Sequence, residues 1–304
     1  MTWTDDLDRR PGPTTWTEDL DRGPGPTTWT DDLDRGPGPT TWTEDLDRRP
    51  GPRTWTDDLE TDEAERTEPV TAEADDEALG RAVRRARLVL WDFDGPICRL
   101  FAQYRASRIA DEMVRWLADR GMGGLLSPHE QATDDPQAVL RAVDRRCPGS
   151  DLAAGLEEFC TAAELRAVPS ATPTAHADPL IRTWSAIGCR LAVVTNNSPR
   201  AVGAYLAGRG LSPCFSPHVY GRTRDLHRLK PDPYSLDRAL SATKVAASAT
   251  LMVGDSPSDL AAATCAGVGF LGYARNDRKE KLLRDAGAQV IVGSLEPVLR
   301  VVGR

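Results

Sequence analysis

The sequence predicts an α/β protein with a doubly wound parallel sheet, an inserted α-helical domain and a disordered, repetitive N-terminal tail. From about residue 80 to the C-terminus, short apolar runs alternate with segments of helical periodicity. This alternation is typical of a parallel sheet with helices on both faces. A long block of helical patterns interrupts it after the first strand, and residues 1–79 repeat a short polar unit instead.

The strands and helices of the sheet domain follow from these patterns. Strands are expected at 86–92, 190–195, near 216–220, 250–254, 268–273 and 288–292. Helices are expected at 178–187, 199–209, 232–242, 257–266, 276–286 and in a last segment that ends near residue 302. Residues 80–98 and 178–304 therefore form the predicted core domain.

Residues 99–177 form the inserted domain, which we expect to be helical. Helical apolar faces are predicted at 108–120, 136–145 and 152–168. In the first of these segments, Ile109, Met113 and Leu117 recur at a spacing that places them on one face of a helix. Such faces indicate helices that pack against one another.

The N-terminal tail is a tandem repeat. A tryptophan recurs every thirteen residues within near copies of T-W-T-D/E-D-L-D-R, at Trp3, Trp16, Trp29, Trp42 and Trp55. One Trp and one Leu per unit bury too little surface to offset chain entropy, so we expect residues 1–79 to be disordered. Two alternatives remain open. The units form a linear array that binds a partner with avidity, or they are a tandem DNA expansion with no role in the natural product.

Composition excludes several classes of protein. No apolar stretch approaches about eighteen residues and the acidic N-terminus lacks the apolar part of a secretory signal, so no membrane contact is expected. The six cysteines are far apart and the four histidines are scattered, which favours reduced thiols in a cytoplasmic protein and disfavours a zinc site. No basic motif with interleaved aromatic residues supports nucleic-acid binding.

The most informative stretch is an apolar run, Leu88 to Trp91, that ends in two aspartates and a glycine. The run predicts a buried strand. Asp92 and Asp94 are two residues apart, so they point to the same side of an extended chain, and Gly95 allows a sharp turn. Neighbouring carboxylates repel each other and resist burial, so a divalent cation with oxygen ligands is expected here. A solvated strand end is the alternative.

Three further segments carry polar residues of the same kind. Thr195 and Asn196 follow an apolar run and offer a hydroxyl and backbone N–H groups to phosphate oxygens, although capping of the next helix has the same pattern. Lys230, one of only four lysines, suits a point contact with phosphate, or is an exposed loop residue. Asp255 follows another buried strand, and Asp259 lies one helical turn later, so both can reach the same sheet edge or cap a helix.

The order of these segments resembles the haloacid dehalogenase-like (HAD) hydrolase superfamily. The resemblance covers roughly residues 86–300 and includes all four motifs, namely the acid pair, Thr-Asn, Lys-Pro and Gly-Asp-x-x-x-Asp. Within this superfamily, the sequence is similar in particular to the phosphoglycolate phosphatases. The resemblance implies a Rossmann-like core with residues 99–177 as a helical cap inserted after the first motif. Open parallel sheets also bind ligands beyond the carboxyl ends of their strands.

The resemblance implies a Mg²⁺-dependent phosphatase that acts on a small phosphorylated metabolite. Asp92 would be the nucleophile that forms an aspartyl-phosphate, and Asp94 would be the general acid and base. Mg²⁺ would be held by Asp92, the backbone carbonyl of Asp94, and Asp255.

The remaining motif residues are assigned through the same resemblance. Thr195 and the Asn196 amide would bind the transferred phosphoryl group. Lys230 would neutralise charge between Asp92 and the phosphate, and Asp259 would orient the metal ligands or Lys230.

Two other functions fit the sequence. A phosphomutase on the same scaffold would return the phosphoryl group to a sugar. The four motifs do not separate it from a phosphatase, because residues of the cap choose the acceptor. A non-catalytic binding protein would act through the Trp repeats. Nothing in the sequence favours one oligomeric state.

Overall fold

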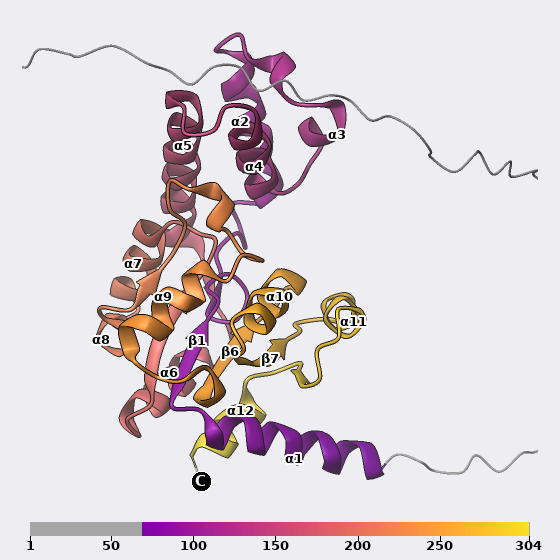
Figure 1. The fold of residues 1–304 in the computed structure, drawn as a ribbon, viewed down its shortest axis with the longest axis vertical. Helices are drawn as coiled ribbons and strands as arrows, with labels where there is room; N and C mark the ends of the chain where they lie inside the picture. Colours follow the sequence, from indigo (N-terminus) through magenta and orange to yellow (C-terminus); the bar gives the residue numbers. More distant parts are fainter. Residues whose placement is uncertain (1–68, 304) are drawn as a thin grey trace, which may run out of the picture. The chain divides into compact units, whose positions relative to one another are not determined.

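The computed structural model describes residues 69–303 of the chain (Figure 1). The Trp repeats, with the disorder and the binding array considered for them, lie outside the described residues. Within residues 69–303, no helix combines the length and the apolar character needed to cross a bilayer. The predicted fold class is confirmed, because a parallel sheet packs against helices on both faces and a helical block follows its first strand.

The main sheet has six parallel strands in the order β5-β4-β1-β6-β7-β8. The strands are β1 (Leu88–Trp91), β4 (Arg190–Val194), β5 (Val219–Tyr220), β6 (Thr250–Gly254), β7 (Gly269–Tyr273) and β8 (Ile291–Val292). β1 lies in the middle, paired with β4 on one side and β6 on the other. The carboxyl ends of these three strands therefore lie side by side where the strand order reverses, which is where such sheets bind ligands.

The core helices cover this sheet in alternation with the strands. They are α1 (Pro69–Arg85), α6 (Ala177–Ala186), α7 (Pro199–Gly208), α8 (Ser212–Phe215), α9 (Tyr234–Thr243), α10 (Pro257–Cys265), α11 (Asp277–Asp285) and α12 (Glu296–Val302), with 3₁₀ turns at Leu226–Arg228 and Ala247–Ala249. The predicted strands near 216–220 and at 288–292 are too long. In the first case residues 216 and 217 form the turn that follows α8, and Pro217 has no N–H to donate to a sheet.

The central strand is apolar throughout because both of its faces are buried. Val89 and Trp91 belong to the core on one face, and Leu88 and Leu90 to the core on the other. Trp91 also contacts Trp184 of α6 edge to face, with ring centroids 5.7 Å apart. A strand buried on both faces loses the alternation of polar and apolar residues and becomes a continuous apolar run.

The inserted block has a core of its own. Its helices are α2 (Ala106–Ala118), α3 (Pro128–Gln131), α4 (Pro136–Arg146) and α5 (Asp151–Ala167), with 3₁₀ turns at Gly123–Leu125 and Val168–Ser170. Ile109, Met113 and Leu117 are buried in that core, as their spacing predicts. The short strands β2 (Cys98–Arg99) and β3 (Thr172–Pro173) pair antiparallel where the chain enters and leaves the block. We call this block the cap.

The structure corrects the predicted end of the disordered tail. Residues 69–79 were expected to be disordered, but α1 begins at Pro69 and continues through residue 79 to Arg85. The helix lies against α12 at the end of Figure 1 opposite the cap, and Leu79 and Val83 are each only 4% exposed. These two apolar side chains anchor an otherwise polar helix, and this tertiary contact overrides the polar composition of the segment.

Deletion of α1 is therefore expected to destabilise the protein. Loss of Leu79 and Val83 from the core removes about 2 kcal/mol each from the free energy of unfolding, so a protein that begins at residue 86 should melt well below the full chain. A protein that begins at residue 69 is the control. Its melting temperature should match that of the full chain, and its turnover should stay within about threefold. Equal melting of the two truncated proteins would contradict the anchoring role of α1.

Candidate active site

Carboxylates from two adjacent strands meet at the edge of the sheet. Asp92 follows β1 directly, Asp255 follows β6 directly, and Asp259 lies in the first turn of α10. One carboxylate oxygen from each of the three residues lies within 4.8 Å of the other two, and all three residues are buried. The structure thus brings together the acidic residues that the sequence placed at separate strand ends.

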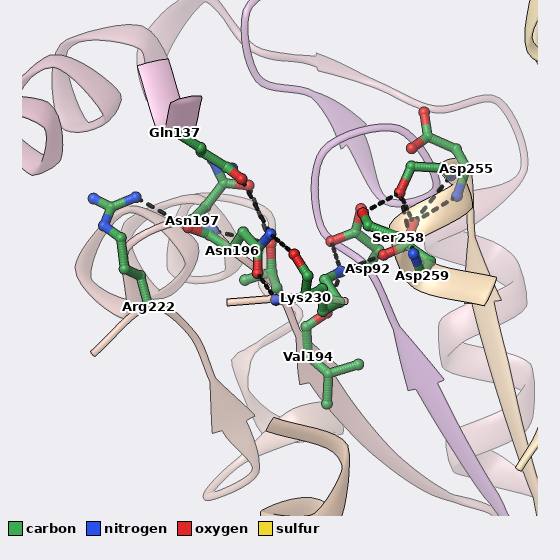
Figure 2. Close-up of polar contacts among 12 residues, drawn as sticks. Asp92, Gln137, Val194, Asn196, Asn197, Arg222, Lys230, Asp255, Ser258 and Asp259 are labelled. Carbon is green, nitrogen blue, oxygen red and sulfur yellow. Dashed lines mark hydrogen bonds and ion pairs between the residues drawn. The ribbon is translucent and has the colours of Figure 1, made fainter. Parts of the chain in front are cut away.

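Lys230 lies among these carboxylates and is only 2% exposed (Figure 2). Its Nζ lies 2.8 Å from Asp92 Oδ1, 2.5 Å from Asp259 Oδ1 and 3.0 Å from the carbonyl oxygen of Val194. The three N–H groups of the ammonium therefore have three oxygen partners. Burial alone would lower the pKa of Lys230, but Asp259 and Asp92 raise it above its ordinary value, so the lysine is held as a cation.

Asp259 organises the loop that carries Asp255. Its Oδ2 accepts hydrogen bonds from the backbone N–H groups of Asp255 and Ser256, both at 3.1 Å, and from the Ser256 hydroxyl at 2.8 Å. The Ser256 side chain in turn caps α10. A Cβ atom at Gly254 would lie 2.5 Å from Cβ of Asp259, so only glycine allows this close approach. Asp259 thus contacts both Lys230 and the Asp255 loop.

Asp94 lies beside the cluster at the start of the route to the cap. Its Oδ1 accepts a hydrogen bond from the Leu100 N–H at 2.8 Å. Burial raises the pKa of Asp94 to about 6, although the Leu100 hydrogen bond opposes the shift. Gly95 follows with φ of +125°, and a side chain at this position would run into the Asp255 carboxylate. The predicted turn after the acid pair is therefore required by both backbone conformation and space.

The charges of the cluster fit a divalent cation. Burial raises the pKa of Asp92, as does the nearby charge of Asp259. Burial also raises the pKa of Asp255 to about 6, against the opposing effect of Lys279. Four carboxylates, those of residues 92, 94, 255 and 259, face two ammonium groups, those of residues 230 and 279, and the guanidinium of Arg275, which acts on Asp94. The negative charges outnumber the positive ones, and hard divalent cations prefer such oxygen donors.

Lys279 forms an ion pair with Asp255 that the sequence did not predict. It lies in the first turn of α11, and its Nζ is 2.8 Å from Asp255 Oδ2 and 3.1 Å from the Asp255 carbonyl oxygen. The chain has only four lysines, which is the one available signal. The distance between residues 255 and 279 in the sequence hides the pairing.

Thr195 and Asn196 lie at the end of β4, next to Lys230. The Thr195 hydroxyl is 3.1 Å from Asn197 Oδ1 and accepts the Asn197 N–H at 3.2 Å. The Asn196 side chain accepts the Lys230 N–H at 2.7 Å and donates to the Lys230 carbonyl oxygen at 3.1 Å. The backbone N–H of Asn196 has no acceptor within residues 69–303. It therefore remains available to a ligand, as a phosphate-binding group must.

A cavity of about 440 Å³ connects these groups with the cap. The core lines it with the carboxylates, Thr195, Asn196 and Lys230, and the cap lines it with Gln137 and Arg141 of α4. Gln137 Oε1 accepts a hydrogen bond from Asn196 Nδ2 at 3.1 Å (Figure 2). The cap thus contributes side chains to the same space as the strand ends. Its helical pattern gave no sign of which residues would do so.

The fold and this cluster define a hydrolase with carboxylates at the ends of parallel strands. A model of a hydrolase family, described as haloacid dehalogenase-like hydrolase, matches residues 86–267. The chain belongs to this family of haloacid dehalogenase-like hydrolases, as the four motifs indicate, and it is an enzyme of that class.

Two relatives with similar sequences are phosphoglycolate phosphatases. The chain is 30% identical over 236 residues to a phosphoglycolate phosphatase of Pseudomonas fluorescens, and this match covers 72% of this chain and 83% of that protein. It is 41% identical over 100 residues to a phosphoglycolate phosphatase of Rhodospirillum rubrum, and this match spans 32% of the chain and only 41% of the relative. The fold is similar to that of CbbY from Rhodobacter sphaeroides in complex with phosphate, with a TM-score of 0.54 at 19% identity over 72% of this chain and all of that one.

Proposed function

We propose that the protein is a Mg²⁺-dependent phosphatase that hydrolyses a small phosphomonoester through an aspartyl-phosphate. The observation that carries the proposal is the meeting of the Asp92 and Asp255 carboxylates with the Lys230 ammonium in one buried cluster. The names of the relatives support a small phosphorylated substrate, and phosphoglycolate is the first compound to test.

The metal would be held by Asp92, the backbone carbonyl of Asp94, and Asp255. Mg²⁺, when bound, supplies positive charge to the phosphoryl oxygens and to the attacking carboxylate. Asp259 and Lys230 keep the ligands in place, because Asp259 holds the backbone of Asp255 and Lys230 holds Asp92 Oδ1.

The proposed reaction has two steps on the phosphorus atom. A carboxylate oxygen of Asp92 forms a bond to phosphorus while the bond to the alcohol oxygen breaks, and Asp94 gives that oxygen its proton. Asp94 then takes a proton from water as the water oxygen bonds to phosphorus, which releases phosphate and restores Asp92. A carboxyl pKa near 6 suits a group that both gives and takes a proton near neutral pH.

The phosphoryl group itself would be bound by Thr195, Asn196 and Lys230. The Thr195 hydroxyl and the Asn196 N–H donate hydrogen bonds to its oxygens, and Lys230 offsets the charge between it and Asp92. Phosphoryl transfer is catalysed mainly by positioning and by electrostatic stabilisation, so these groups suffice for the reaction.

Turnover of p-nitrophenyl phosphate and of a panel of phosphometabolites tests the proposal. We expect release of inorganic phosphate with Mg²⁺ and none with EDTA, because the attacking carboxylate and the phosphate repel each other without the cation. Transfer of the phosphoryl group to a sugar, without its release, would instead favour a phosphomutase. A folded protein that turns over no phosphoester would favour a binding protein, and activity that EDTA leaves unchanged would contradict the metal site.

Replacement of Lys279 should tighten Mg²⁺ binding. The Lys279 ammonium forms an ion pair with Asp255 Oδ2, and this partly exposed pair contributes about 1 kcal/mol. Because a metal ion must compete with the ammonium for this oxygen, Lys279→Met should lower the Mg²⁺ dissociation constant about fivefold. Titration calorimetry measures the constant without any substrate. Lys281→Met is the matched control, because Lys281 lies on the same helix but pairs only with the exposed Asp285. Weaker binding after Lys279→Met would show that the lysine supports the metal site instead.

A further inference from the structure

A second buried charge cluster lies behind the candidate phosphate-binding loop, which comprises residues 195–198. Its centre is Arg222, which follows β5 and whose side chain is fully buried. Its main partner is Glu164 of α5, with a side chain only 2% exposed. Neither residue takes part in the reaction described above, and neither belongs to one of the four motifs. Figure 2 shows Arg222 beside Asn197 on the side away from Asp255.

All five N–H groups of the Arg222 guanidinium are used. Nε donates to Glu157 Oε1 at 2.9 Å. Nη1 donates to Glu164 Oε1 at 2.8 Å and to the Asn196 carbonyl oxygen at 3.0 Å. Nη2 donates to the Thr161 hydroxyl at 2.9 Å and to Glu164 Oε2 at 3.2 Å. The planar fork of arginine fits these acceptors, whereas the point charge of lysine does not.

The same cluster holds the phosphate-binding loop. Glu164 accepts hydrogen bonds from Asn197 Nδ2 at 3.1 Å and from the Ser198 N–H at 2.8 Å. The Arg222 N–H donates to the Asn197 carbonyl oxygen at 2.9 Å. Asn197 in turn contacts the Thr195 hydroxyl. A continuous chain of hydrogen bonds therefore joins the cap helix α5 to the group that binds phosphate.

We propose that Arg222 and Glu164 are positioning residues that set the phosphate-binding loop, so that the cap helix α5 determines the affinity of the site for phosphate. The inference rests on the proposed function, because it takes residues 195–198 as the phosphate-binding loop. The phosphate-binding loop, the segment that carries Arg222, and helix α5 meet at the Arg222 side chain. A Cβ at Gly221 would lie 2.6 Å from the Asn197 carbonyl oxygen, so the backbone of the phosphate-binding loop is closely packed on this side.

The position of the cluster separates its effect on phosphate from any effect on the metal. Arg222 and Glu164 contact residues 196–198 directly, whereas they reach Asp92 only through Asn196 and Lys230. The Asp255 loop is held by Lys279 and Asp259 instead. Disturbance of Arg222 should therefore weaken phosphate binding and leave Mg²⁺ binding unchanged. A cluster that only stabilised the fold would lower the melting temperature and change neither affinity selectively.

The test compares Arg222→Lys and Asn197→Ala with the full-length wild type. We expect the inhibition constant of inorganic phosphate, measured at saturating Mg²⁺ against p-nitrophenyl phosphate, to rise at least about tenfold in both variants. The Mg²⁺ dissociation constant from calorimetry should stay within about twofold. Asn197→Ala keeps the Arg222–Glu164 pair and so protects the test against a loss of folding.

Glu130→Gln is the control. It removes the ion pairs of Glu130 with Arg145 and Arg146, which lie within the cap, and should lower the melting temperature without changing phosphate inhibition. Unchanged phosphate inhibition in folded Arg222→Lys or Asn197→Ala would overturn the inference, as would a parallel loss of Mg²⁺ affinity. A folded wild-type protein that does not turn over p-nitrophenyl phosphate at all would overturn the proposed function itself.

Discussion

Replacement of Asp92 by asparagine should lower kcat for p-nitrophenyl phosphate at least about a thousandfold, which corresponds to about 4 kcal/mol of transition-state stabilisation. An amide oxygen is a poor nucleophile and carries no charge for the metal. The side chain keeps its shape, and its oxygen can still accept the hydrogen bond that Lys230 donates at 2.8 Å. Because burial disfavours the ionised form of Asp92, the melting temperature of Asp92→Asn should be equal to or higher than that of the wild type.

Asp285→Asn is the matched control for this change. Asp285 lies at the exposed end of α11 and pairs only with Lys281, so the same chemical change there should leave turnover unaltered. If Asp92→Asn kept a tenth or more of the wild-type rate, Asp92 would not be the nucleophile.

Replacement of Lys230 by methionine should damage both activity and stability. Lys230 is the ion-pair partner of Asp92 and Asp259, and its loss leaves two buried carboxylates without a counter-ion, at a cost of about 3–5 kcal/mol of unfolding free energy in the absence of metal. Turnover should fall at least about a hundredfold, because the charge between Asp92 and the phosphoryl group is no longer offset.

The stability of Lys230→Met should also depend on pH. Without the ammonium, the pKa of Asp92 rises further above its unfolded value, so the folded state binds more protons than the unfolded state. The stability deficit should therefore be small at mildly acidic pH and grow as the pH rises, which urea unfolding at several pH values measures. Lys281→Met provides the exposed control. A deficit that shrinks with rising pH would contradict the account.

The strands of the sheet and the residues at their ends could be predicted because the local sequence determines them. Each buried strand is a short apolar run, and the polar residue directly after it must lie at the carboxyl end of the sheet. Asp92, Thr195 and Asp255 follow β1, β4 and β6, which are adjacent because β1 pairs with both of the others. Three of the four motif segments follow such strands, and Lys230, which follows a 3₁₀ turn, was placed with them through the resemblance to the family.

The contacts that escaped prediction join residues far apart in the chain. Lys279 reaches Asp255 from another helix, and Arg222 is buried against Glu164 of the cap, 58 positions away. A lysine or arginine on a polar stretch has the same sequence pattern whether it is exposed or buried. The helix around Leu79 was missed for a related reason, since among its described side chains, those of residues 77–85, Leu79 and Val83 are the buried apolar ones. Tertiary packing decides such cases, and local propensity does not.

Chemical trapping of the phosphorylated enzyme tests directly whether Asp92 is the nucleophile. The full-length protein is mixed with Mg²⁺ and p-nitrophenyl phosphate, quenched in acid during turnover and treated with hydroxylamine, which converts an acyl phosphate into a hydroxamate. Peptide mass spectrometry then locates the modified residue. We expect a modified Asp92 in the wild type, no modification in Asp92→Asn and none with EDTA. A phosphoryl group trapped on another residue, or rapid turnover with no trapped intermediate at all, would contradict this role of Asp92.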